Sequence, residues 1–214
     1  CLIAGCTAPP DPGQTRTEAL TTAAIARGST WRIWDRGGDL GTAWTARGFD
    51  ASSWASGAGP LGYGESYLAT TVGYGGNPAA KYVTTYFRRD FTVTDPARVT
   101  RLLGDVMFDD GIVVYLNGTR IGSDFMPAGT TTASTYALGH EANQAYLAYD
   151  WSAQRPLLVA GSNTIAVEVH QVDAGSSDLV FDLGLTVEEN AAPPPPPTGE
   201  DLARGSTWSY WDRG

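Results

Sequence analysis

The sequence has few charged residues and few of the residues that bind transition metals. Only 17% of its 214 residues are charged, and it contains two histidines and two cysteines. The net charge of −9 comes from 23 acidic against 14 basic residues, without a basic run to neutralise a phosphate backbone. This balance argues against a nucleic-acid partner and against adhesion of the folded surface to an anionic membrane.

Hydrolase motifs are also missing from the sequence. It has no GxSxG, HExxH or CxxC pattern, and His140 and His170 are too few for the cage of a two-metal phosphoesterase. No apolar run approaches the ~20 residues that span a bilayer. We therefore expect this fragment not to be an enzyme; if the parent protein is a hydrolase, we expect its catalytic domain downstream of Gly214.

Glycine, threonine, serine and aromatic residues are abundant, as is typical of a turn-rich β protein. Apolar and polar residues alternate in "YVTTYFRRDFTV", "NTIAVEVHQ" and "DLVFDLGLTV", a pattern that predicts half-buried strands. Asn117-Gly118 separates two further strand-like runs and favours a type I′ hairpin. The sequence therefore predicts an all-β fold, a two-sheet antiparallel β-sandwich.

A twelve-residue phrase occurs twice. "ARGSTWRIWDRG" begins at Ala26 and "ARGSTWSYWDRG" ends at Gly214, with ten of twelve positions identical. Repetition at a fixed offset indicates tandem structural units. We therefore expect the phrase to form the first strand of each unit, and a neighbouring tandem domain to follow.

Both cysteines lie near the start of the sequence. The stretch "LIAGC", from Leu2 to Cys6, resembles the lipobox that ends a bacterial lipoprotein signal peptide. The resemblance implies lipidation of Cys6, an extracytoplasmic location at the cell envelope or surface, and contact with the membrane through the lipid anchor only. A disulfide between Cys1 and Cys6, or two free thiols, is the alternative.

Composition divides the chain into five segments. Pro, Thr and Ala dominate the stretch after Cys6, and five consecutive prolines at Pro193–Pro197 favour a polyproline II spacer. The predicted order is a signal-peptide remnant, a lipidated flexible tether, a β-sandwich module, a Pro-rich linker and the first strand of a truncated repeat, in residues 1–5, 6–25, 26–188, 189–202 and 203–214, respectively.

Several segments resemble a known family. "GFDASSWASGAGPLGYG", "TTYFRRDFTV", "DDGIVVYLNGTRIG", "AGSNTIAVEVHQ" and "SSDLVFDLGL" resemble galactose-binding-like jelly-roll domains of secreted bacterial hydrolases, including the sugar-binding domain of β-galactosidase-like enzymes. They are also similar to repeated Trp-rich modules found beside metallophosphoesterase and lamin-tail domains. The resemblance implies a jelly-roll sandwich and a carbohydrate-related role, while such modules serve many functions.

Asp109 and Asp110 are the most prominent carboxylate pair. Adjacent residues of an extended chain face opposite ways, so the two cannot by themselves flank one glycosidic bond. The "DDG" sequence favours a tight turn in which an Asp side chain caps backbone amides. The alternative is a ligand for a sugar hydroxyl or for a structural Ca²⁺, although no loop shows the acidic spacing that would identify a Ca²⁺ site.

A second polar group follows a predicted strand. If the strands connect as hairpins, His170, Gln171, Asp173 and Asp178 share one rim of the sandwich with the "DDG" turn. Loops at the end of a rigid scaffold often bind ligands. The alternative is that these side chains only satisfy the backbone of the turns.

Tyr63, Tyr67 and Tyr74 stand among glycines in a segment with little alternation. This pattern predicts a surface loop that presents aromatic rings, on which a sugar stacks. We expect a non-catalytic carbohydrate-binding module of a tandem array, with a glycan or polysaccharide as partner. The alternative is an accessory or spacer domain that positions a downstream hydrolase such as a metallophosphoesterase.

Overall fold

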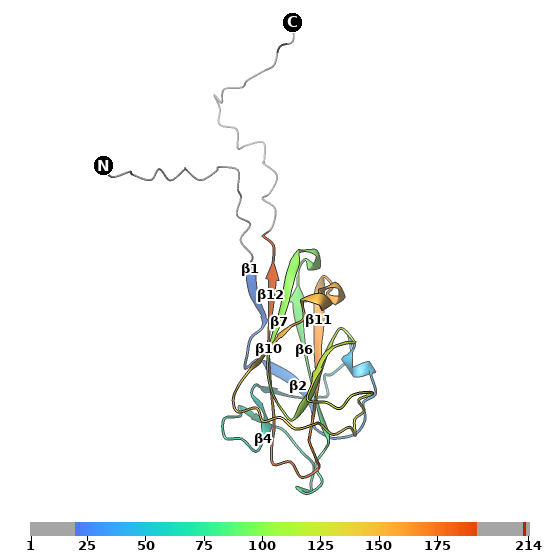
Figure 1. Ribbon diagram of the computed structural model, residues 1–214. Coiled ribbons are helices and arrows are strands. Elements are labelled where there is room, and N and C mark those ends of the chain that lie inside the picture. The colour runs from blue at the N-terminus through green and yellow to red at the C-terminus, as the bar shows by residue number, and fades with distance from the viewer. Residues whose placement is uncertain (1–19, 192–211, 213–214) are drawn as a thin grey trace, which may run out of the picture.

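The computed structural model describes residues 20–191 and Asp212. These residues form two six-stranded sheets that pack face to face (Figure 1). All strand pairs are antiparallel except the short pair of β4 and β5. The predicted all-β, two-sheet antiparallel sandwich is confirmed. Cys6 and residues 1–19, 192–211 and 213–214 lie outside the described residues.

The first sheet has the order β10-β7-β12-β4-β5, and β1 also pairs with β12. Its strands are β1 (Leu20–Ile25), β4 (Leu61–Tyr63), β5 (Thr70–Thr71), β7 (Val99–Asp109), β10 (Leu147–Asp150) and β12 (Leu179–Glu189).

The second sheet has the order β3-β2-β6-β11-β8-β9. Its strands are β2 (Thr30–Trp34), β3 (Ala55–Ala58), β6 (Thr84–Val93), β8 (Gly111–Leu116), β9 (Thr119–Asp124) and β11 (Gly161–His170). Three short 3₁₀ helices lie in the connections: η1 (Ala43–Thr45), η2 (Pro96–Arg98) and η3 (Ser152–Leu157).

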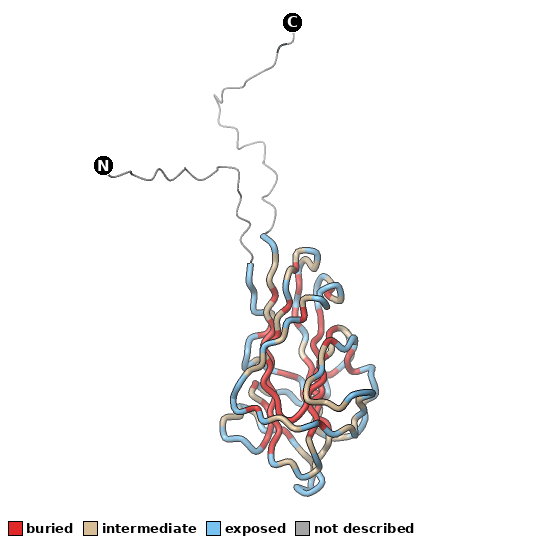
Figure 2. The backbone as a smooth tube through the Cα atoms, in the orientation of Figure 1, coloured by how far each residue is buried: buried red, intermediate tan, exposed pale blue. Residues whose placement is uncertain are grey.

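Aromatic side chains join the two sheets in the core. Phe181 of β12 packs edge-on against Trp31 of β2, with ring centroids 4.9 Å apart. The same ring stacks on Phe87 of β6 at 4.4 Å. All three side chains are buried, and buried residues follow one another along the central strands of the molecule (Figure 2). The alternation predicted from β6, β11 and β12 therefore identifies the inner faces of these strands.

The folded unit begins earlier than the sequence predicts. Leu20–Ile25, assigned to the end of the tether of residues 6–25, form β1 and pair with β12, from Leu20 opposite Glu189 to Ile25 opposite Leu185. Only Ile25 of this strand is buried, so its side chains carry no hydrophobic alternation. Backbone pairing rather than side-chain burial places β1 in the sheet.

A second layer covers the outer face of the second sheet. Trp44 of η1 packs edge-on against Tyr86 of β6 and against Tyr115 of β8. Arg88 of β6 is only 3% exposed because this layer lies over it. Its guanidinium donates to the carbonyls of Trp44 and Ala46, which replaces the water that a charged group requires.

The predicted hairpin at Asn117-Gly118 joins β8 to β9. Both residues have positive φ, 52° and 91°, as a type I′ turn requires. The Asn117 side chain donates to the carbonyl of Leu157 at 2.8 Å and accepts from the Thr164 amide at 2.8 Å. The turn is therefore tied to both η3 and β11.

Replacing Phe181 with alanine should lower the free energy of unfolding by about 3–5 kcal/mol, because the cavity would remove the aromatic contact between the sheets. Urea denaturation followed by tryptophan fluorescence measures this change. Leu138→Ala, at a side chain that is 65% exposed, is the control and should change stability by less than about 0.5 kcal/mol. Equal effects of the two substitutions would contradict the proposed core.

Candidate functional site

Most of the polar residues singled out in the sequence meet at one end of the sandwich. Asp109 ends β7, His170 ends β11, and Asp178 directly precedes β12. The Asp110 amide donates to the His170 carbonyl at 3.3 Å, which joins the turns of the two sheets. We call this region the loop end. It lies opposite the end where β1 starts and β12 finishes (Figure 1).

The aspartates of the "DDG" turn hold neighbouring loops in place. Asp110 Oδ2 accepts from the Val172 amide at 2.8 Å and lies 3.4 Å from the Ser176 hydroxyl. Asp109 Oδ2 accepts from the Ala142 amide at 3.1 Å. Both side chains are buried. They therefore cap backbone amides, as the turn interpretation predicts, and Asp110 is unavailable to a large ligand.

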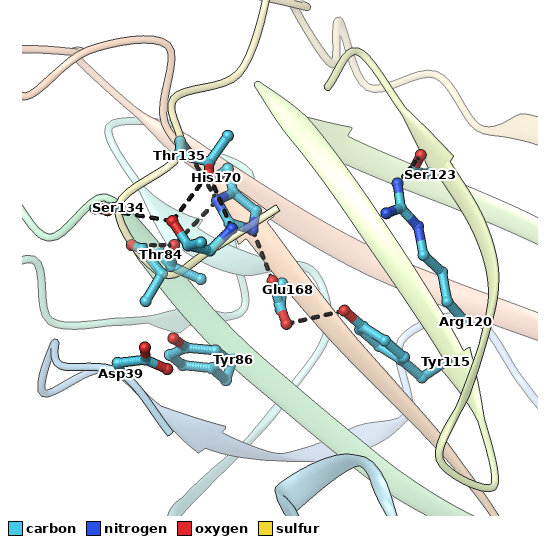
Figure 3. Close-up of polar contacts among 12 residues, drawn as sticks. Asp39, Thr84, Tyr86, Tyr115, Arg120, Ser123, Ser134, Thr135, Glu168 and His170 are labelled. Carbon is cyan, nitrogen blue, oxygen red and sulfur yellow. Dashed lines mark hydrogen bonds and ion pairs between the residues drawn. The ribbon is translucent and has the colours of Figure 1, made fainter. Parts of the chain in front are cut away.

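His170 belongs to a buried hydrogen-bond network in the second sheet (Figure 3). Its Nε2 lies 2.9 Å from Glu168 Oε2, and the other Glu168 oxygen accepts from the Tyr115 hydroxyl at 3.2 Å. Its Nδ1 lies 3.0 Å from the Thr84 hydroxyl and 2.8 Å from the Thr135 carbonyl. The imidazole is fully buried, so it fixes the loop that contains Thr135 and does not face a ligand.

Gln171 is also fully buried. Its backbone amide donates to the Val83 carbonyl at 2.8 Å, and its backbone carbonyl accepts from the Ala137 amide at 2.8 Å. Its side-chain amide has no hydrogen-bond partner among the protein atoms of the described residues. The sequence placed Gln171 at the correct end of the fold, but its side chain lies below the surface.

The three tyrosines do not form the exposed platform that the sequence predicts. Tyr63 lies in β4 and is 5% exposed, with its ring 4.9 Å from that of the partly buried Tyr74. All three residues of β4 are buried, so this strand is covered on both faces. Tyr63 therefore belongs to the core. Tyr67 lies apart from this pair and packs against Met107, Ala142 and Val180.

Tyr67 lines a polar hollow of about 190 Å³, which we call the acidic hollow. Asp109, Glu141 and Asp178 also line it, and one carboxylate oxygen from each lies within 4.8 Å of the others. Glu141 was missed by sequence reasoning, since it lies in the connection between β9 and β10, where no alternation or motif marks it. Carboxylates in this arrangement are ligands for hard cations.

Burial and neighbouring carboxylates raise the pKa values of acidic groups in and beside the acidic hollow. Burial, together with the carboxylates of Asp178 and Asp110, raises the pKa of Asp109 to about 7. Burial is also the main cause of the raised pKa of Asp110. The pKa of the Tyr63 hydroxyl is raised by burial and by the charges of Asp178, Asp110 and Asp109. Ionisation of these groups is therefore opposed by burial and by neighbouring negative charge.

A larger hollow, of about 400 Å³, lies beside the start of strand β6. We call it the Tyr82 hollow. Its polar and aromatic lining residues are Asp39, Lys81, Tyr82, Thr84, Thr132 and Ser134.

The backbone at two glycines lies close to the Tyr82 ring and leaves no room there for a side chain. A Cβ atom at Gly37 would lie 2.5 Å from Cδ1 of the ring, and one at Gly75 would lie 3.2 Å from Cε1. Gly37 has φ +66° and Gly75 has φ +99°, values that L side chains rarely adopt. The glycine-rich segment thus positions an aromatic ring, although a different one from those the sequence predicts.

No protein-family model matches the sequence, and no curated protein matches it. Among solved structures, the fold is similar to part of a Bacteroides uniformis β-glucuronidase, with a TM-score of 0.52 and 18% identity over 79% of this chain and 18% of that chain. A second B. uniformis structure, of β-glucuronidase 2 with a covalently bound aziridine, gives a TM-score of 0.51 with the same identity and coverage. A β-glucuronidase from glycoside hydrolase family 2 gives 0.50, with 14% identity over 81% of this chain and 18% of that chain.

These similarities concern the fold. The chain spans less than a fifth of the length of the enzymes it matches. Within the described residues, no helix has both the length and the apolar character needed to cross a membrane.

Replacing His170 with alanine should destabilise the protein by about 3 kcal/mol, because Glu168 and Thr84 would lose a partner inside the fold. Thermal unfolding monitored by circular dichroism measures the loss. A variant that unfolds like the unmodified protein would contradict the structural role assigned to His170.

Proposed function

We propose that this chain contains a non-catalytic carbohydrate-binding module that is one unit of a larger protein. The observation that carries the proposal is the position of the two connections of the sandwich. Leu20 and Glu189 lie opposite each other in paired strands, so the flanking segments both attach at one end. The loop end therefore lies at the end of the sandwich away from both attachment points, and we propose that a polymer binds there. A rigid spacer that joins its neighbours in line would need its connections at opposite ends.

The Tyr82 hollow has the chemistry of a sugar subsite. Carbohydrate C–H groups stack on an aromatic face, while charged and hydroxyl side chains hydrogen-bond to the sugar hydroxyls. Tyr82 supplies the ring, and Asp39, Lys81 and Ser134 supply polar groups around it. A volume of about 400 Å³ suits one or two sugar rings.

Similarity to parts of β-glucuronidases supports a carbohydrate-related role, because those enzymes act on sugar conjugates and the matched part is only 18% of each chain. A non-catalytic role is supported by the carboxylates at the loop end. Asp110 is buried and accepts from the Val172 amide, and Asp109, which accepts from the Ala142 amide, opens only onto the acidic hollow, which among residues 20–191 shares no lining residue with the Tyr82 hollow, whereas the acid of a glycosidase must reach the bound sugar.

A glycan array probed with the 214-residue chain should show binding to at least one glycan. Tyr82→Ala should weaken that binding about tenfold or more, because the sugar loses its stacking surface. Tyr136→Ala is the matched control, since this tyrosine is 42% exposed and lies outside both hollows, and it should bind normally. Failure of the folded chain to bind any glycan would overturn the proposal.

We also propose that Cys6 carries a lipid anchor that holds the module at the outside of the bacterial cell. Expressed in a bacterium with only the charged and apolar regions of a lipoprotein signal joined to Cys1, so that Leu2–Cys6 is the lipobox, the chain should incorporate an alkyne-labelled fatty acid and fractionate with membranes. Cys6→Ser should abolish the label and release the protein, whereas Cys1→Ser should change neither. Labelling that persists in Cys6→Ser would contradict the anchor.

A further inference from the structure

We propose that Asp109, Glu141 and Asp178 bind a Ca²⁺ ion that fastens three segments of the loop end together. One carboxylate oxygen from each residue lies within 4.8 Å of the other two. Two oxygens on opposite sides of one Ca²⁺ ion are about 4.8 Å apart, since each bond is about 2.4 Å long. The three oxygens are no farther apart than two ligands of one ion can be, so a small adjustment of the exposed Glu141 side chain would let all three carboxylates reach one ion.

The most deeply buried member of this group, Asp109, has an unused oxygen. Asp109 is 1% exposed, and its Oδ2 accepts from the Ala142 amide. Its Oδ1 is buried and has no hydrogen-bond partner among the protein atoms of the described residues. A buried carboxylate oxygen without a partner is costly, and a cation in the adjoining acidic hollow would satisfy it.

Positive side chains do not balance these charges. Within residues 20–191, none of the salt bridges involves Asp109, Glu141 or Asp178. The side-chain contacts of Asp178 include the Ser177 hydroxyl at 2.9 Å, which is a neutral donor. A divalent cation would compensate most of the charge of three neighbouring carboxylates.

The donor atoms favour Ca²⁺ over other metals. All three ligands are carboxylates, and among the described residues neither His nor Cys lines the hollow, which disfavours zinc and copper. Asn143 and Gln144 line the same hollow and can add neutral oxygen ligands. Mg²⁺ requires a near-ideal octahedron with bonds of about 2.1 Å and usually keeps several waters, whereas Ca²⁺ accepts about six to eight oxygen ligands in a flexible geometry, which suits carboxylates from three separate segments.

The ion would join elements that are distant in the sequence. Asp109 ends β7, Glu141 lies in the connection between β9 and β10, and Asp178 precedes β12. Asp109 and Asp178 lie at the ends of the neighbouring strands β7 and β12 of the first sheet, whereas Glu141 is exposed in a long connection. Binding would therefore chiefly restrain that connection, which also contains Thr132 and Ser134 of the Tyr82 hollow.

Isothermal titration of the metal-free 214-residue chain with CaCl₂ tests the proposal directly, without any glycan. We expect one bound ion per chain, a higher melting temperature in CaCl₂, and slower proteolysis between β9 and β10. Glu141→Gln should weaken Ca²⁺ binding at least about tenfold while the metal-free protein keeps its melting temperature, since Glu141 is exposed. Asp178→Asn should weaken binding by a similar factor.

Glu188→Gln is the matched control, because it removes the same charge at the opposite end of the sandwich and should bind Ca²⁺ normally. Absence of Ca²⁺ binding by the folded chain would overturn the proposal, and so would equal affinity of the Glu141→Gln variant. Tighter binding of Mg²⁺ than of Ca²⁺ would overturn the choice of ion. Because the titration contains no carbohydrate, its result is independent of the glycan array.

Discussion

Phe181 lies between Trp31 and Phe87 where the two sheets face each other, and the rest of the structure depends on this contact. Long strands on both sides of it set the positions at which β7, β11 and β12 reach the loop end. The apolar packing of Phe181 thereby helps to determine where the polar side chains of the loop end meet. The acidic hollow and the Tyr82 hollow lie where these strands begin or end, so their geometry is set by the packing of the core.

Polar groups are buried in the outer layer and at the loop end, and they differ in whether the surrounding residues supply hydrogen-bond partners for all of their atoms. Arg88 and His170 are surrounded by acceptors or donors, so their burial fixes loops at modest cost. Asp109 keeps one oxygen without a partner in the described part of the chain, next to two further carboxylates. Such an uncompensated group departs from the rule that buried polar atoms are paired, and departures of this kind gather at binding sites.

The fold class was predictable from the sequence because the apolar side chains that face the core recur at every second residue in strands such as β6, β11 and β12, although the structure covers both faces of these strands along much of their length. The meeting of Asp109, His170 and Asp178 followed from the antiparallel connections. Side-chain exposure was not predictable, since Tyr63 and Tyr82 both stand near glycines and only the three-dimensional contacts separate the buried ring from the one in a hollow. β1 and Glu141 were missed because neither backbone pairing at an edge nor a single loop carboxylate leaves a pattern.

The pairing of β1 with β12 has a mechanical consequence. Leu20 and Glu189 are adjacent, so tension transmitted through the flanking segments would pull the two strands apart from one end, as a zipper opens. Hydrogen bonds in this arrangement break one after another rather than all at once. Since β1 buries only Ile25, it would detach at low force while the aromatic core stayed intact. The module would then lengthen under load by the extent of one strand and keep its loop end folded.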